Sequence, residues 1–193
     1  MMPTAPTTPR IAPGGRRDIG VLNTVIARIG GRVAGTEPLN LFRTLGRARG
    51  LFLGWLHFSG RLMPGGRLLR RETELVILRV AHLAGCAYEL EHHVVLARRA
   101  GVTDDDVARV VAGPGADGWS RREHAILAAV DELHHQRDVT DVTWTELRTH
   151  LDERQAIELC LLVGNYELLA TTINTLRIRP DEPRRRGSLA HAH

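Results

Sequence analysis

"RRETELVILRVAHLAGCAYELEHHVVLARRAG", residues 70–101, decides how this chain folds. It contains two runs with apolar residues at helical spacing, 70–84 and 86–100, with Gly85 between them. A glycine between two such runs favours a tight turn, so we predict two helices packed antiparallel as a hairpin. This hairpin is the predicted centre of the domain.

Outward from the hairpin, the pattern stays helical. Thr36 before "EPLNLF", "TDDD" (103–106), "SRRE" (120–123) and "TWTE" (143–146) are typical of helix N-termini. No alternating strand pattern bounded by turns stands out. The sequence therefore predicts an all-α domain of about eight or nine helices, placed at residues 18–30, 37–48, 50–62, 70–84, 86–100, 103–112, 120–137, 143–150 and 152–176.

The two ends of the chain differ in composition from its middle. Residues 1–17 are rich in Pro, Thr and Gly, and residues 179–193 are highly charged. Such segments bury too little apolar surface to offset the entropy of ordering, so we expect disordered tails. Residues 18–178 are expected to form one helical domain, because the whole chain of 193 residues suits one sizeable core.

Composition excludes several classes of protein. The net charge is +4 and all 26 basic residues are arginine, but no basic stripe with interleaved aromatics appears, so no nucleic-acid partner is expected. No apolar run approaches the roughly 20 residues that span a bilayer, and the N-terminus has no apolar signal segment. We expect a cytoplasmic protein without a membrane partner. The two cysteines, Cys86 and Cys160, make no disulfide framework, and Cys160 within "LCLLVG" is expected in the core.

Helix geometry separates the two adjacent histidines of the second hairpin helix. At ~100° per residue, His92 falls on the face of Glu91, Arg98 and Arg99, which we expect to be solvated. Glu89 and His93 fall on the apolar face, within an arc of ~60° that includes Cys86. His93, rather than His92, is therefore the expected site residue.

Glu74, in the first hairpin helix, is independent evidence for a site at this position. It belongs to an apolar stripe with Ile77 and Leu78, where an unpaired carboxylate would cost several kcal/mol. Because residues equidistant from Gly85 face each other, Glu74 comes within about one turn of His93. The predicted site therefore consists of Glu74, Cys86, Glu89 and His93.

The chemistry of these four side chains leaves alternatives open. Cys86 lies at a helix N-terminus, where the dipole and a protonated His93 would lower the thiol pKa and favour a reactive thiolate. Two carboxylates beside one imidazole are also typical of proton relays. A small core cysteine and a structural Glu–His pair are the simpler readings, and a metal site made of Glu74, Glu89 and His93 is a further one. A weak internal echo links "GCAYEL" (85–90) to "GNYEL" (164–168).

The same segment resembles the carboxymuconolactone decarboxylase family, which includes the alkylhydroperoxidase D-like proteins. The resemblance covers about residues 40–178 and is densest over 70–107. It implies an all-helical fold and a homo-oligomer, trimer or hexamer. The alkylhydroperoxidase motif, a glutamate followed by Cys-x-x-Cys and then x-x-x-His, falls on Glu74, Cys86 and His93. Its second cysteine position is Glu89, so the disulfide of that motif cannot form here.

Two enzyme classes follow from the resemblance, and neither calls for a cofactor or a metal. The first, with which we lead, is a thiol peroxidase that uses Cys86 alone, takes a hydroperoxide and is reset by an external thiol reductant. The second is an acid–base decarboxylase or isomerase of a lactone-type carboxylic acid, in which Glu89 and His93 move protons. A helical oligomer without catalysis is the third reading. The substrate in either enzyme is a small molecule.

Overall fold

A computed structural model describes residues 8–184 and places them in nine helices, with no strand among these residues. The expected all-α fold is confirmed, and the parts of the expected tails at residues 1–7 and 185–193 lie outside the described residues. The helices are α1 (Arg16–Ala34), α2 (Asn40–Leu45), α3 (Arg49–Leu62), α4 (Arg70–Leu83), α5 (Ala87–Arg99), α6 (Asp104–Ala112), α7 (Arg121–Gln136), α8 (Asp141–His150) and α9 (Glu153–Leu176).

Side-chain caps explain where several helices begin. Thr103 and Ser120 each accept a hydrogen bond from the backbone N–H three residues later, as the sequence predicts for α6 and α7. Two predicted starts are wrong. Thr140, rather than Thr143, caps α8, and Thr36 pairs with Pro183 in an isolated bridge while α2 begins later at Asn40.

The chain divides into two compact units, the first made of residues up to Gly54 together with those from Arg177 onward. Within this unit, Glu37 N–H donates to the carbonyl of Glu182 at 2.8 Å. Gly14 N–H donates to the carbonyl of Arg43 at 3.0 Å. The described parts of both expected tails are therefore held by backbone hydrogen bonds.

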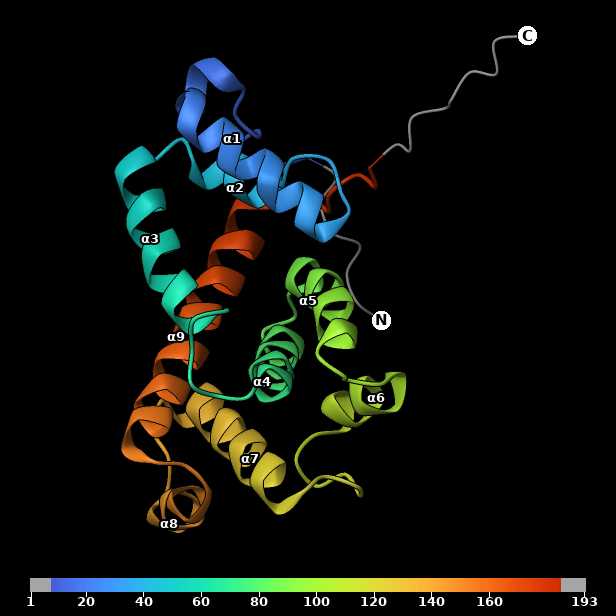
Figure 1. Ribbon diagram of the computed structural model, residues 1–193, viewed down its shortest axis with the longest axis vertical. Helices are drawn as coiled ribbons and strands as arrows, with labels where there is room; N and C mark the ends of the chain where they lie inside the picture. Colours follow the sequence, from blue (N-terminus) through green and yellow to red (C-terminus); the bar gives the residue numbers. More distant parts are fainter. Residues whose placement is uncertain (1–7, 185–193) are drawn as a thin grey trace, which may run out of the picture. The chain divides into compact units, whose positions relative to one another are not determined.

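The second unit, Trp55–Leu176, contains the hairpin. Its central helix is α4, which packs against α5, α6, α7 and α9 (Figure 1). All residues from Glu72 to Ala81 are buried, so every face of α4 is covered. Gly85 forms the turn between α4 and α5 with a φ of +59°, a conformation that glycine adopts without steric cost. The predicted hairpin at the centre of the domain is thus present.

Helix α9 is the longest element and packs against α4, α7 and α8. Among the described helices it alone is long and apolar enough to cross a membrane by those two criteria, whereas the sequence pattern predicts no such segment. More than half of its apolar window is buried inside the protein. That burial is typical of the core helix of a helical domain.

Candidate active site

The site is built around His93, whose two ring nitrogens each face a buried carboxylate. Nδ1 lies 2.8 Å from Glu74 Oε2, across the hairpin from α5 to α4. Nε2 lies 3.3 Å from Glu89 Oε2, one turn earlier on α5. The exposed fractions are 0% for Glu74, 4% for Glu89 and 5% for His93. The structure thus brings together the two glutamates and the histidine that the sequence singles out.

Arg70 extends this row of charges towards the surface. Its Nη2 lies 2.6 Å from Glu74 Oε1, one turn away on α4, and its side chain is 40% exposed. Glu74 Oε1 receives no hydrogen bond, so its contact with Arg70 is an ion pair only. Arg70, Glu74, His93 and Glu89 form a row of alternating charge when His93 is protonated, so their formal charges cancel.

The two glutamates determine the protonation state of His93. Burial by itself would lower the pKa of the imidazole, but the hydrogen bonds to Glu74 and Glu89 and their charges outweigh it. The pKa of His93 is raised from 6.5 to about 9. The ring is therefore an imidazolium at neutral pH, with one N–H directed at each carboxylate.

Cys86 lies beside this group as the N-terminal cap residue of α5, and only 1% of it is exposed. Burial raises the pKa of its thiol to about 11. The backbone N–H groups of Glu89 and Tyr88 act in the opposite direction, and the Glu89 carboxylate adds to the rise. The expectation of a lowered thiol pKa is therefore wrong: desolvation exceeds the effect of the helix N-terminus.

Two further sequence expectations differ from the structure. His92 is half-buried rather than fully solvated, since its ring stacks on Tyr88 at a centroid distance of 4.7 Å. Cys160 is exposed, not in the core, because it lies on the outer face of α9. Glu91, Arg98 and Arg99 are exposed as expected.

Tyr166 is a member of the cluster that helix-face reasoning did not select. It projects from α9 and packs its ring edge-to-face with His93, with centroids 5.2 Å apart and planes at 87°. Only 6% of it is exposed. The echo of "YEL" at 88–90 and 166–168 was the available signal, but sequence alone does not show that α9 packs beside the hairpin.

Chemically, the cluster is arranged to hold and move a proton. Because both ring nitrogens of the protonated His93 direct an N–H at a carboxylate, the ring offers no lone pair to a metal ion. Within residues 8–184, no three His, Cys, Asp or Glu side chains converge as possible metal ligands. The arrangement instead matches a carboxylate–imidazole–carboxylate relay.

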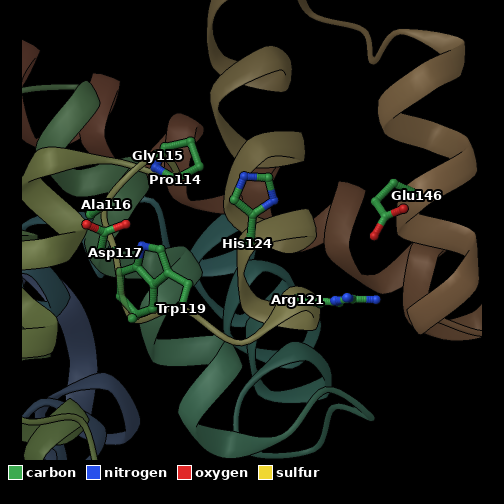
Figure 2. A pocket seen from close by; sticks show the side chains of 9 residues that line it. Pro114, Gly115, Ala116, Asp117, Trp119, Arg121, His124 and Glu146 are labelled. Atoms are coloured by element: carbon green, nitrogen blue, oxygen red, sulfur yellow. The ribbon is translucent and has the colours of Figure 1, made fainter.

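A surface pocket of about 320 Å³ lies elsewhere in the second unit and includes none of the predicted site residues. Figure 2 shows the loop that precedes α7 on one side, Glu146 of α8 on the other, and His124 between them. The side chains of opposite charge around it include Asp117 and Arg121. These residues are not part of the relay.

The model of the carboxymuconolactone decarboxylase family matches residues 50–132, which include the whole hairpin. The uncharacterized protein YdfG of Bacillus subtilis (strain 168) is 30% identical over 97 residues, which make up 49% of this chain. The match spans 66% of YdfG, just under two thirds of its length.

Solved structures share the fold at low identity. The debrominase Bmp8 superposes with a TM-score of 0.73 at 17% identity, over 88% of this chain and 91% of that one. A peroxidase-related protein from Silicibacter sp. TM1040 has a TM-score of 0.73 at 15% identity, over 93% of each chain. An alkylhydroperoxidase AhpD core protein from Ralstonia eutropha JMP134 has a TM-score of 0.72 at 18% identity, over 88% of this chain and 92% of that one.

The fold is that of the AhpD-like all-helical proteins. The region around the hairpin, residues 50–132, is similar to the carboxymuconolactone decarboxylase family.

Proposed function

We propose that this protein is a cofactor-free acid–base enzyme, a decarboxylase or isomerase of a lactone-type carboxylic acid. The observation that carries the proposal is the buried His93, held through both ring nitrogens by Glu74 and Glu89. The substrate class is taken from the family whose model matches residues 50–132.

In this proposal, His93 holds the proton and Glu89 transfers it between the His93 ring and the substrate. Decarboxylation breaks the bond to the carboxyl carbon, releases CO₂ and leaves the electron pair on a conjugated enolate. The imidazolium of His93 passes its Nε2 proton to the Glu89 carboxylate, and Glu89 delivers this proton to carbon to form the new C–H bond. A proton from solvent then restores the imidazolium. Glu74 orients the ring and stabilises its charge, much as a buried carboxylate fixes a catalytic histidine elsewhere.

Two observations make the thiol peroxidase the second candidate function, although the sequence places it first. Its thiol is buried with a pKa raised to about 11, so the nucleophilic thiolate is scarce at neutral pH. Glu89 occupies the position of the second motif cysteine and is engaged with His93. The acid–base reading instead gives Glu89 and His93 direct roles.

The single-cysteine peroxidase is kept as a second candidate because of one local feature. The N–H groups of Glu89 and Tyr88 face the sulfur and favour its anionic form. Proteins of similar fold are described as peroxidase-related, although they share under 25% identity with this chain. That activity would use a hydroperoxide and an external thiol reductant.

One experiment separates the two candidates. Purified protein is given a panel of unsaturated γ-lactone carboxylates with detection of released CO₂ and of isomerised product, and separately tert-butyl hydroperoxide with dimedone and mass spectrometry. Acid–base catalysis predicts turnover that Glu89→Gln and His93→Gln abolish, whereas Cys86→Ser has a mild effect. Glu91→Gln, an exposed neighbour on α5, is the matched control.

The contrary result is equally clear. Dimedone labelling of Cys86, with peroxide consumption that Cys86→Ser removes and Glu91→Gln retains, would replace the acid–base proposal by the peroxidase.

Assembly and location belong to the same proposal. Helix α9 exposes Ile157, Leu161 and Leu168 at 61%, 46% and 56%, which supports the expected homo-oligomer because large exposed apolar patches mark interaction surfaces. Light scattering that gives the 21.4 kDa mass of one chain would contradict it. A cytoplasmic location is part of the proposal.

A further inference from the structure

The hydroxyl of Tyr166 is a buried donor with a poor acceptor. Tyr166 is 6% exposed, and its hydroxyl donates to Met63 Sδ at 3.7 Å. A thioether sulfur is a weak acceptor, and a buried donor without a good partner costs free energy. Such a group therefore needs an explanation, and a ligand oxygen in place of the sulfur would supply one.

The position of Tyr166 connects it to the relay. Its ring contacts His93 edge-to-face at 5.2 Å, and the charges of Glu89 and Glu74 reach its hydroxyl. Burial first, and then these two carboxylates, raise the pKa of Tyr166 well above 10. The hydroxyl thus keeps its proton at neutral pH and stands as a neutral donor beside an acid.

We propose that Tyr166 is a catalytic residue whose hydroxyl donates a hydrogen bond to the carbonyl oxygen of the bound substrate. This inference rests on the proposed acid–base function and adds a requirement to it: the substrate must carry a carbonyl conjugated to the reacting carbon. When the bond to carbon breaks, its electron pair moves onto that oxygen, and the hydrogen bond stabilises the resulting enolate. The electron pair returns when carbon is protonated, and Tyr166 keeps its own proton throughout.

Met63 is the side chain that the substrate would displace. It is half-buried and precedes α4 in the chain, and methionine side chains change rotamer readily. Exchanging a sulfur acceptor for a developing oxyanion strengthens the hydrogen bond of Tyr166 most in the transition state, as differential binding requires.

The test uses para-nitrophenolate, a coloured oxyanion, as a binding probe of the full-length protein. Wild type is expected to bind it at least ~10-fold more tightly than Tyr166→Phe, which keeps the ring against His93 and removes only the donor. Tyr88→Phe, at a buried tyrosine that stacks on His92, is the matched control and should bind as wild type does. Met63→Leu should bind the probe at least as well, because it removes the competing acceptor. Circular dichroism and thermal unfolding verify that each variant folds.

Turnover supplies the second readout. Tyr166→Phe should lower kcat for an active γ-lactone carboxylate by about 10²-fold, the usual effect of removing one oxyanion donor. The imidazole NMR titration of His93 should keep its midpoint, which a general structural disturbance would shift.

The outcomes separate this inference from the proposed function. Equal probe binding by wild type and Tyr166→Phe, or no binding by wild type, would overturn the role of Tyr166. If Tyr166→Phe turns over a lactone acid at the wild-type rate, the role of Tyr166 is also overturned, but the proposed acid–base function is retained. Tyr166-dependent probe binding without turnover of any lactone acid would retain the donor site and reject the proposed reaction.

Discussion

Glu74 and His93 are 19 residues apart in the chain, yet the Glu74 carboxylate and the His93 imidazole meet at 2.8 Å inside the hairpin. The contact depends on the turn at Gly85, which brings the middle of α4 opposite the middle of α5. Because Glu74 is fully buried, its charge is balanced within the protein by His93 and Arg70 rather than by water.

The two thiols should differ sharply in reactivity. A pKa of about 11 for Cys86, against an ordinary value of 9.0, leaves about 100-fold less thiolate at neutral pH, and burial further limits access. Burial raises the pKa of Cys160 as well, but by less, and because Cys160 is exposed it should be alkylated first. Iodoacetamide kinetics of the single-thiol variants Cys86→Ser and Cys160→Ser measure each thiol separately. Faster labelling of Cys86 than of Cys160 would show that the helix N-terminus outweighs desolvation.

Substitution of the adjacent histidines should have unequal effects. His93→Gln removes a charge that two buried carboxylates require, and uncompensated buried charge costs about 3–5 kcal/mol. His92→Gln loses only a half-buried stacking contact with Tyr88, of about 0.5–1.5 kcal/mol. Urea unfolding of both variants measures the difference, and equal losses would refute the assignment of His93 to the inner face.

Stability should fall as the pH rises through the titration of His93. Its folded pKa of about 9 exceeds the ordinary 6.5, so the stabilisation is complete below about pH 6.5 and is lost as the pH rises through about 9. Unfolding free energies of wild type and His92→Gln should both decline over that range. The decline attributable to His93 should be absent in His93→Gln, and an unchanged slope there would assign the effect to another group.

Helix α4 also carries a structural ion pair that can be tested independently. Arg79, 7% exposed, donates to both oxygens of Asp131 at 2.7 Å and to the carbonyls of Val110 and Val111. Arg79→Ala should cost about 3–5 kcal/mol, because it leaves these acceptors without their donor.

The control for this pair is Arg98→Ala, which breaks the exposed pair with Asp104 and should cost under about 1 kcal/mol. Similar losses at the two positions in thermal unfolding would contradict the assigned difference in burial.

Sequence reasoning reached the hairpin and the relay because both depend on local periodicity. The spacing of Glu89 and His93 is one helical turn, and Gly85 as a turn residue places Glu74 opposite. Sequence patterns do not predict burial correctly where it depends on which helices pack together. Cys160 lies in an apolar run, but the outer side of α9 faces away from α4 and α7, and a single helix pattern does not show this.

The same limit explains the error about the thiol and the omission of Tyr166. A helix N-terminus can be located from sequence, whereas the desolvation that opposes it depends on distant segments packed over Cys86. Tyr166 joins the cluster from a helix more than 70 residues away in the chain, and only the packing of α9 against α4 brings it to His93.

The burial of Glu74, His93 and Glu89 limits how fast a proton taken from a ligand can exchange with water. A proton passed from a ligand to Glu89 exchanges with bulk water only when this part of the protein opens, because the acceptors on both sides of His93 are shielded. In the isomerase form of the proposed reaction, the atom taken from one carbon would return to another before it is exchanged. A reaction run in heavy water would then give product that retains the substrate's own hydrogen.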